Sequence, residues 1–392
     1  MKVTGKLAFM AIFAFVLFAA GCAAPPKPKE STVFFPSPPA LPRYQFLASF
    51  TGAEDMEGGR SAFDTFVTGE KEDRRKLSKP YGVAMHGGKI YVCDTGGAVI
   101  VFDLEKKTYG QLKGAQGAGK MVQPINISID KEGNKFITDT LRKLVVIFNV
   151  NDEYVTTIGI KENWKPVHAV RYDDRIYVTD PDNSEIKVFE WGSGNLLKTF
   201  GKDSMDRPMN LAFDSQGYLY VSDIGRFQVL KFDRDGHLLQ AVGKLGLNYG
   251  HFSRPKGVAV DRSGKIYVVD ASFYNVQVFR ENGQLLTFFG GGGTGPGNLI
   301  LPAQVSLDYD NQNYFAQYLS PNFEMEYLVF VTSQFGDRKV SVYAFGKEKG
   351  RKYPSEEELD EELKKTLLDN ARKEFKQNVA PAKATDEGLS PK

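Results

Sequence analysis

Few side chains in this sequence could carry chemistry. The 392 residues include only four histidines and two cysteines, Cys22 and Cys93, and no Cys-x-x-Cys motif. A catalytic zinc ion needs about three protein ligands, and a disulfide framework or a covalent haem needs more cysteines than these. The sequence therefore predicts no covalent haem, no disulfide framework and no metal or cofactor.

The net charge of the chain does not indicate a class of partner. Lys and Arg number 50 and Asp and Glu number 48, a formal net charge of +2. Nucleic-acid binding draws on a strong basic field over the domain. We therefore do not expect a nucleic-acid partner.

The candidate side chains lie on a unit that recurs six times. Each unit begins with a proline, at positions 80, 124, 166, 208, 255 and 302, with spacings of 44, 42, 42, 47 and 47. Five units place an aspartate 14 or 15 residues later: Asp94, Asp139, Asp180, Asp223 and Asp270. An aromatic residue that ends an alternating strand follows eight or nine residues after that: Phe102, Phe148, Phe189, Phe232 and Phe279.

Each unit contains alternating patterns for four short strands. Four strands in about 40–50 residues are typical of a β-propeller blade. The sequence predicts an all-β fold, a six-bladed β-propeller of four-stranded blades over residues 44–346. The last unit lacks a fourth strand, and the N-terminal segment 44–50 is expected to supply it and close blade six.

The chain resembles the NHL-repeat family of propellers. The motifs that carry the resemblance are Pro-x-Gly-Val-Ala-Val-Asp at 255–261, Ile-Tyr-Val-Val-Asp at 266–270 and Val-Gln-Val-Phe at 276–279. Blade six departs from the pattern, with Ser333 in place of the aspartate and an insertion at 309–326. Propellers of this architecture include zinc-dependent amidating lyases, streptogramin-type lyases and calcium-dependent lactonases.

The second residue after each proline is expected at the mouth of the central channel. These residues are Gly82, Asn126, His168, Asn210, Gly257 and Gln304. Asn126, His168, Asn210 and Gln304 are the binding candidates. A channel calcium or zinc ion remains an alternative, but the ring contains no carboxylate and a single histidine. The simpler interpretation is that the amides satisfy backbone groups or bind water.

The repeated aspartates are expected to have a structural role. An aspartate at a strand end accepts backbone N–H bonds and fixes the following turn. Five equivalent active sites are a far less economical explanation.

A second ring consists of the residues that precede the prolines. Lys79, Lys165, Arg207 and Arg254 are basic and are expected on one face, where Lys256 and Arg226 add to them. This pattern predicts a surface for an anionic partner. The alternative is that these are ordinary solvated loop charges.

Two long connectors are the remaining binding candidates. Residues 309–326 carry four aromatics that are either partner anchors or packed on the propeller itself. These are Tyr314, Phe315, Tyr318 and Phe323. The connector 51–78 carries Phe63 and Phe66 and has the same two interpretations.

The N-terminal residues resemble a targeting signal. Lys2 and Lys6 precede an apolar run that ends in Ala-Ala-Gly-Cys at residues 19–22, which resembles the lipobox of bacterial lipoproteins. The resemblance implies a signal peptide at 1–21 and lipidation of Cys22. Residues 22–43 contain seven prolines and are expected to form a stiff tether. Alanine after the cysteine implies the outer membrane of a Gram-negative bacterium, facing the periplasm or the surface.

The C-terminal segment is expected to be an α-helix over 347–379, followed by a disordered tail at 380–392. Ser355 and Glu358 form a capping-box pattern. Apolar residues at four-residue spacing give the helix one apolar stripe. They are Leu359, Leu363, Leu367, Ala371 and Phe375.

Together these features favour a membrane-anchored scaffold that binds a protein or glycan partner at the cell envelope. Some family members in anaerobic bacteria accompany exported multihaem cytochromes, so the resemblance implies a role in assembly or export. The alternative is a metal-dependent lyase or lactonase with a divergent site at the channel mouth. Stoichiometric metal in the purified protein would favour the alternative.

Overall fold

The computed structural model describes residues 32–57, 76–160 and 162–355, together with residues 358, 361 and 365. A compact unit starts at Val33. The predicted signal peptide, Cys22, Phe63, Phe66, the apolar stripe of the C-terminal helix and the tail at 380–392 lie outside the described residues. Among the helices within the described ranges, none is long and apolar enough to cross a lipid bilayer.

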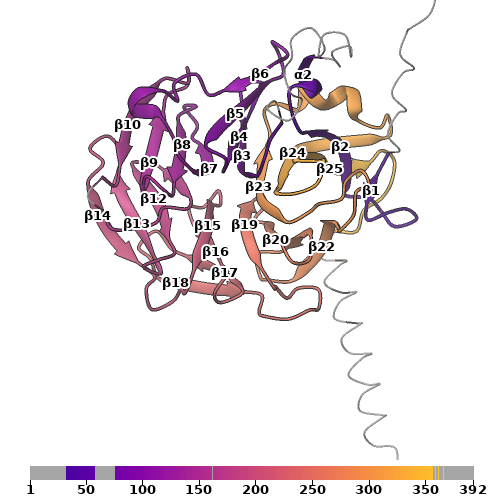
Figure 1. The fold of residues 1–392 in the computed structure, drawn as a ribbon. Helices are drawn as coiled ribbons and strands as arrows, with labels where there is room; N and C mark the ends of the chain where they lie inside the picture. The colour runs from indigo at the N-terminus through magenta and orange to yellow at the C-terminus, as the bar shows by residue number, and fades with distance from the viewer. Residues whose placement is uncertain are drawn as a thin grey trace, which may run out of the picture. The chain divides into compact units, whose positions relative to one another are not determined.

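Six antiparallel sheets are arranged around a central axis, which confirms the predicted propeller (Figure 1). Blade one contains β3 (Pro80–His86), β4 (Lys89–Asp94), β5 (Ala98–Asp103) and β6 (Thr108–Gln111). Blade two contains β7 (Pro124–Ile129), β8 (Lys135–Asp139), β9 (Leu144–Phe148) and β10 (Tyr154–Ile158). Blade three contains β11 (Ala169–Tyr172), β12 (Arg175–Asp180), β13 (Glu185–Glu190) and β14 (Leu196–Phe200).

Blades four and five repeat this order. Blade four contains β15 (Pro208–Phe213), β16 (Leu219–Asp223), β17 (Gln228–Phe232) and β18 (Leu238–Val242). Blade five contains β19 (Pro255–Val260), β20 (Ile266–Asp270), β21 (Asn275–Phe279) and β22 (Leu285–Gly290). Three short helical segments lie in connectors: α2 (Glu54–Glu57), η2 (Gly117–Gly119) and η3 (Gln312–Tyr318).

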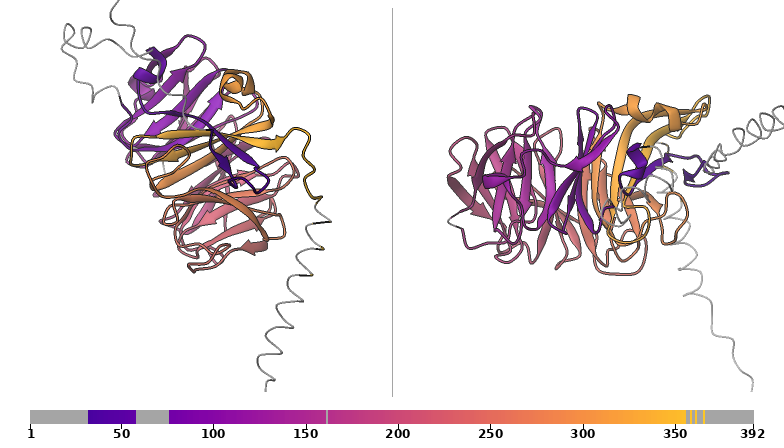
Figure 2. Two further views of the ribbon diagram at one scale, coloured as in Figure 1. Left: turned by 90° about the vertical axis from the view of Figure 1, so that its right-hand side faces the viewer. Right: turned by 45° about the horizontal axis from the view of Figure 1, so that its top comes forward.

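Blade six is closed by both ends of the propeller. It joins β23 (Pro302–Asp308), β24 (Phe323–Ser333) and β25 (Val340–Glu348) to β2 (Tyr44–Phe50). Figure 2 shows the indigo β2 lying among the orange and yellow strands of this sheet. The predicted closure by residues 44–50 is therefore confirmed, and it leaves no open seam in the ring.

Blade six has a fifth strand that the sequence analysis missed. β1 (Phe34–Phe35) pairs with β2, and Val33 and Phe35 pack against the core between blades five and six. Residues 33–43 were predicted to belong to a tether that does not pack. That boundary is wrong, because two aromatic side chains among the prolines reach apolar surface on the sheet.

The core consists of six apolar layers, one between each pair of neighbouring blades. Inner strands are therefore largely covered by the neighbouring blades and are mainly apolar, with polar exceptions such as Asn126, Asn210 and Gln304. The outer strands β14 and β18 are half exposed. The five predicted aromatics of the third strands are all buried. The layer between blades six and one includes Leu47 and Phe50 of β2, so the closing strand is part of the core.

The two ends of the blades form different faces. In blade six, Pro302 pairs with Ser333 and Phe50 pairs with Val340 at one end, which we call the proline face. Tyr44 pairs with Phe345 at the other end, the hairpin face, where each first strand turns back into the second. Both chain termini of the propeller therefore leave from the hairpin face.

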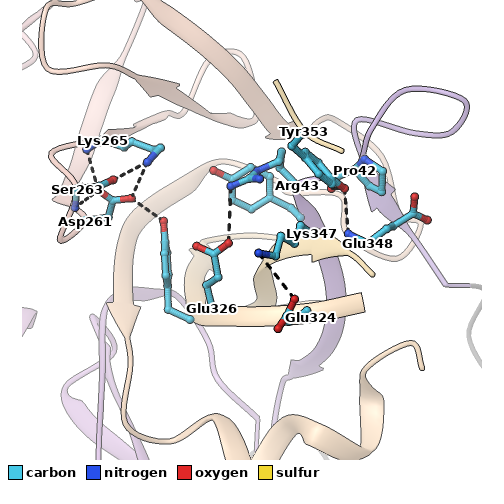
Figure 3. A network of polar contacts seen from close by, with 12 residues as sticks. Pro42, Arg43, Asp261, Ser263, Lys265, Glu324, Glu326, Lys347, Glu348 and Tyr353 are labelled. Atoms are coloured by element: carbon cyan, nitrogen blue, oxygen red, sulfur yellow. Dashed lines mark hydrogen bonds and ion pairs between the residues drawn. The ribbon is translucent and has the colours of Figure 1, made fainter. Parts of the chain in front are cut away.

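Polar contacts, which we call the polar clamp, join the segment 42–43 before β2 to the end of β25 and the residues that follow it at the hairpin face (Figure 3). The Tyr353 hydroxyl donates to the Pro42 carbonyl (2.7 Å) and accepts from the Glu348 N–H (3.0 Å). The Arg43 guanidinium lies over the rings of Phe345 and Tyr353. The start and the end of the propeller are thus held side by side.

The start of the C-terminal helix follows the predicted capping box. The Ser355 N–H donates to the Glu358 carboxylate (2.8 Å), and the Glu358 N–H donates to Ser355 Oγ (3.1 Å). Residues 358, 361 and 365 have helical geometry. The capping prediction is confirmed, and the remainder of the helix lies outside the described residues.

Candidate functional site

A β-bulge after the proline aims side chains at the propeller axis. The register between first and second strands shifts directly after the proline in blades one, two, four, five and six. Bulges re-aim side chains and commonly occur beside binding sites. The residues that follow the prolines are therefore freed from the regular ladder and can face the channel.

The four predicted channel residues do come together. Asn126, His168, Asn210 and Gln304 are all buried. Gln304 Oε1 accepts a hydrogen bond from Asn126 Nδ2 (3.5 Å) and another from Asn210 Nδ2. One glutamine thus joins blades two, four and six across the mouth of the channel.

Glycines at two ring positions make this crossing sterically feasible. A Cβ on Gly82 would lie 2.6 Å from Asn126 Cα, and one on Gly257 would lie 2.8 Å from Gln304 Cα. Backbone contacts that close cannot be relieved by rotating a side chain. Blades one and five therefore carry glycine because their neighbours approach too closely for any side chain.

His168 is a neutral hydrogen-bonding group in this ring. Its Nδ1 accepts from the Leu211 N–H (3.2 Å), and its Nε2 has no partner. Burial lowers the pKa of His168 to about 3. The His168 imidazole is therefore neutral at physiological pH and is a poor base. Its proton lies on Nε2, which is a donor without a hydrogen-bond acceptor.

The channel offers few groups to a metal ion. Asn126 Oδ1 accepts from the Ile127 N–H, and Gln304 Oε1 already accepts two bonds, so Asn210 Oδ1 is the unpartnered amide oxygen. Calcium uses six to eight oxygens and zinc about three strong ligands. Across the described ranges no three His, Cys, Asp or Glu side chains are grouped to hold a metal. The donors in this ring fit a water molecule or a small polar group better than either ion.

The repeated aspartates have the structural role that their spacing predicts. Asp223 accepts from the N–H groups of Asp206 (2.7 Å), Arg207 (2.9 Å), Gly225 (2.9 Å) and Arg226 (3.1 Å). Asp94, Asp139 and Asp270 make equivalent bonds, and Asp180 retains part of the set. Each carboxylate ties the turn after the second strand to the segment before the proline.

A ring of hydroxyls beside these aspartates was missed by the sequence analysis. The residue before the aspartate position donates to the carbonyl of the residue after the next blade's proline. The four pairs are Thr138 with Val167, Thr179 with Met209, Ser222 with Lys256 and Thr332 with Tyr81. The signal was present in the sequence as a polar residue inside an otherwise apolar strand.

The predicted basic residues share the proline face. Lys79, Lys165, Arg207 and Arg254 are all exposed, and none forms an ion pair with another described residue. Arg226 is held by the Asp203 carbonyl (3.2 Å). Lys256, expected to add to the exposed charge, is only 5% exposed.

The aromatic insertion of blade six packs mostly on its own body. Phe315 and Phe323 are buried in the layer between blades six and one, and Tyr314 is partly buried against it. Tyr318, at 46% exposed, is the one of these four aromatics that reaches solvent freely. The alternative to a partner anchor therefore holds for Phe315 and Phe323.

The insertion also contacts the beginning of the propeller. Gln45 Nε2 donates to the Tyr318 carbonyl (2.9 Å), and Gln45 Oε1 accepts from the Ser320 N–H (3.0 Å). The insertion therefore lies beside the strand that follows the N-terminal segment. Cys93, the cysteine within the described ranges, is a free and buried thiol.

Comparisons with known proteins agree with this architecture. The sequence model of the NHL repeat matches residues 252–280, which include β19, β20 and β21. No curated protein matches the chain. Among solved structures, a gluconolactonase from Xanthomonas campestris has 16% identity and a TM-score of 0.51, covering 83% of this chain and 100% of that one.

Two proteins from Bacteroides thetaiotaomicron are also similar. A structural genomics protein of unknown function has 12% identity and a TM-score of 0.54, with coverage of 76% of this chain and 75% of that one. An auxiliary nutrient binding protein has 12% identity and a TM-score of 0.52, with coverage of 69% of each chain. Because all three identities are low, these similarities extend to the fold alone. The chain is a six-bladed β-propeller that carries an NHL repeat in blade five.

Proposed function

We propose that this protein is a non-catalytic binding platform of the bacterial cell envelope, lipidated at Cys22 and presenting its proline face to an acidic protein partner. The observation that carries the proposal is the separation of the two faces. The propeller's ends, Arg43 and Tyr353, are clamped at the hairpin face. The four basic residues named above, Lys79, Lys165, Arg207 and Arg254, lie at the opposite ends of the blades.

This separation suits a tethered receptor. A lipid anchor on Cys22 connects to the body through residues that lead to β2, which starts at the hairpin face. Both ends of the propeller, Tyr44 and Glu348, lie at the opposite face, and the four basic side chains of the proline face are exposed. Basic side chains that form no ion pair with a described residue retain their charge for attracting an anionic surface and for accelerating its association.

The channel residues support binding over catalysis. Its side chains are amides and a neutral histidine of low basicity, and neither type supplies a nucleophile or a general base near pH 7. A polar, buried and largely satisfied ring stabilises the shape of the proline face. The centre of the channel ring offers a partner's polar group one donor, His168 Nε2, and one acceptor, Asn210 Oδ1.

The test is capture of partners from the organism's own detergent-solubilised membranes with the full tagged chain. The double variant Lys165→Glu and Arg207→Glu should lose a co-purifying protein that wild type retains. The matched control, Lys106→Glu and Lys131→Glu, makes the same charge change in exposed turns of the hairpin face and should retain it. Equal recovery with both double variants would overturn the choice of face.

The anchor is tested separately by metabolic labelling with a radioactive fatty acid. Wild type should incorporate label and sediment with membranes, whereas Cys22→Ser should do neither. A soluble, unlabelled wild-type protein would contradict the lipoprotein assignment and leave the proline-face proposal to its own test.

The competing function is hydrolysis of a lactone, since one similar structure is a gluconolactonase. The assay is turnover of gluconolactone with added calcium or zinc, together with metal analysis of the purified protein. Turnover that disappears in His168→Asn and Asn210→Ala would favour the enzyme. We expect no turnover above the rate in buffer.

A further inference from the structure

Three neighbouring blades bring a buried cation and a buried hydroxyl together at the proline face. Lys256 follows the proline of blade five, and Tyr81 follows the proline of blade one. Between them, blade six has Ala303 at the same position, a side chain too small to separate its neighbours. Lys256 Nζ consequently lies 5.4 Å from the centroid of the Tyr81 ring.

The Lys256 ammonium lacks a counter-charge among the described residues. Its side chain donates to Gln334 Oε1 (3.0 Å), a neutral amide, and Lys256 is 5% exposed. Burial first, and then the nearby charges of Arg254 and Lys79, lower the pKa of Lys256 to about 8. At pH 7 the amine is therefore mainly protonated, and a buried cation is retained at a cost in stability.

The other buried lysines show what a structural role requires. Lys135, Lys187 and Lys231 are the other three buried lysines of the described ranges, and each has a carboxylate within 3.0 Å. Buried charges in proteins are normally paired in this way. Lys256 is the exception among the described residues.

Tyr81 supplies an independent sign of a missing partner. Its side chain is 6% exposed, and its hydroxyl has no hydrogen-bond partner in the structure. A buried hydroxyl without a partner costs about 1–3 kcal/mol and is uncommon in native proteins. An ammonium without a counter-charge among the described residues and a hydroxyl without a hydrogen-bond partner therefore lie at one place on the proline face.

We propose that Lys256 Nζ and the Tyr81 hydroxyl form a subsite for a carboxylate group, with Arg254 and Lys79 as the positive rim that guides it. A carboxylate has two acceptor oxygens and one negative charge, which match one ammonium and one neutral hydroxyl. A phosphate dianion would leave excess negative charge in the buried part of the site. The subsite deepens the proposed function, since it rests on the proline face meeting an acidic partner.

The probe is sodium acetate, and the readout is the NMR signal of Lys256 in the full chain purified in neutral detergent. Lysine labelled with ¹³C at Cε reports protonation, and Lys256→Met identifies the signal. Acetate should shift this signal saturably and raise the pKa of Lys256 towards that of a paired lysine. Sodium chloride at equal ionic strength should not.

Variants assign the effect to the subsite. Tyr81→Phe keeps the ring and removes one oxygen, so the fold should persist while acetate affinity falls about tenfold, as for a charge-assisted hydrogen bond. Arg254→Gln at the rim should weaken binding about threefold. Lys106→Met, at an exposed lysine in a turn of the hairpin face, should leave acetate binding unchanged.

Three results would overturn the proposal. The first is no saturable shift with acetate, and the second is a saturable shift with inorganic phosphate alone. The third is acetate binding that appears only when Asp64, Glu70, Glu72 and Asp73 are neutralised, which would mean that the chain's own carboxylate is the ligand. Acetate is titrated against the isolated protein. A lack of acetate binding therefore contradicts the carboxylate subsite alone, whereas a lack of partner capture contradicts the proposed function.

Discussion

Two buried lysines at opposite faces of this propeller have opposite surroundings. At the hairpin face, Lys135 is fully buried and contacts the Asp152 carboxylate (2.7 Å) and the carbonyls of Asn149 and Val150. At the proline face, the Lys256 ammonium donates to one neutral amide, that of Gln334, and lies over the Tyr81 ring, without a carboxylate among the described residues. The first arrangement is complete within blade two, and Asp152 extends it to Lys89 and Tyr91 of blade one. The second is incomplete, which is the usual signature of a binding residue.

The same contrast separates other groups at the two faces. At the hairpin face, Asp152 also accepts from Lys89 (2.9 Å) and from the Tyr91 hydroxyl (2.9 Å). Burial alone would raise the pKa of Asp152, but the bonds from Lys135 and Lys89 outweigh it and hold the pKa below its usual value. At the proline face, Tyr81, His168 and Asn210 each retain an unpartnered polar atom. Unmet hydrogen bonds thus concentrate where we expect the partner.

The largest effect should come from uncoupling Lys135. Asp152 has a φ of 65°, which asparagine tolerates, so Asp152→Asn preserves shape and removes only the charge. A fully buried lysine would lose its carboxylate, and we expect a loss of about 3–5 kcal/mol in urea unfolding at pH 7. A loss below about 1 kcal/mol would mean that this network is not a stabilising contact.

Acid should destabilise the fold through His168. Its pKa is about 3 in the native protein and 6.5 when unfolded, so the unfolded chain binds more protons between these values. Stability is therefore full above pH 6.5 and falls as the pH decreases towards 3, on the order of 4 kcal/mol from this group. His168→Asn, the residue of blades two and four, should flatten that part of the urea stability profile. The exposed His237→Gln is the control.

Lys256→Met should raise the free energy of unfolding, whereas Asp152→Asn should lower it. The pKa of Lys256 is about 8 in the native protein and 10.5 when unfolded. The cost of burying its charge is therefore absent above pH 10.5, grows as the pH falls and is complete below pH 8. Met should raise the unfolding free energy at pH 7 by about 1–3 kcal/mol, with little gain above pH 10.5. A loss of stability at pH 7 would remove the comparison on which the carboxylate subsite depends.

The smallest effect should come from the ring of hydroxyls, which four of the six blades form. Thr179→Val removes the bond to the Met209 carbonyl (3.0 Å) between blades three and four and keeps the side-chain volume. We expect a loss of about 1 kcal/mol, measured by thermal and urea unfolding. Blade five already has Val269 at this position, so Val269→Ala, which creates a cavity instead, is the comparison variant.

The sequence by itself determined the elements that repeat. The prolines, aspartates and third-strand aromatics recur at fixed spacing, so the blade count, the turn role of residues such as Asp223 and the closing strand 44–50 could all be predicted. These features are local or periodic, and each copy reports on the others. Residues 33–43 have no second copy, and their prolines concealed the fact that Phe35 packs on the sheet.

Only the tertiary structure decided which side chains meet. The sequence placed Asn126, His168, Asn210 and Gln304 on one ring, but the crossing by Gln304 depends on glycines in blades one and five. Tyr81 and Lys256 are 175 residues apart and come together because blade six offers an alanine between them. Whether a buried lysine has a carboxylate nearby is likewise a property of neighbouring blades. Contacts between blades depend on the sizes of side chains that are distant in sequence, and no local pattern records them.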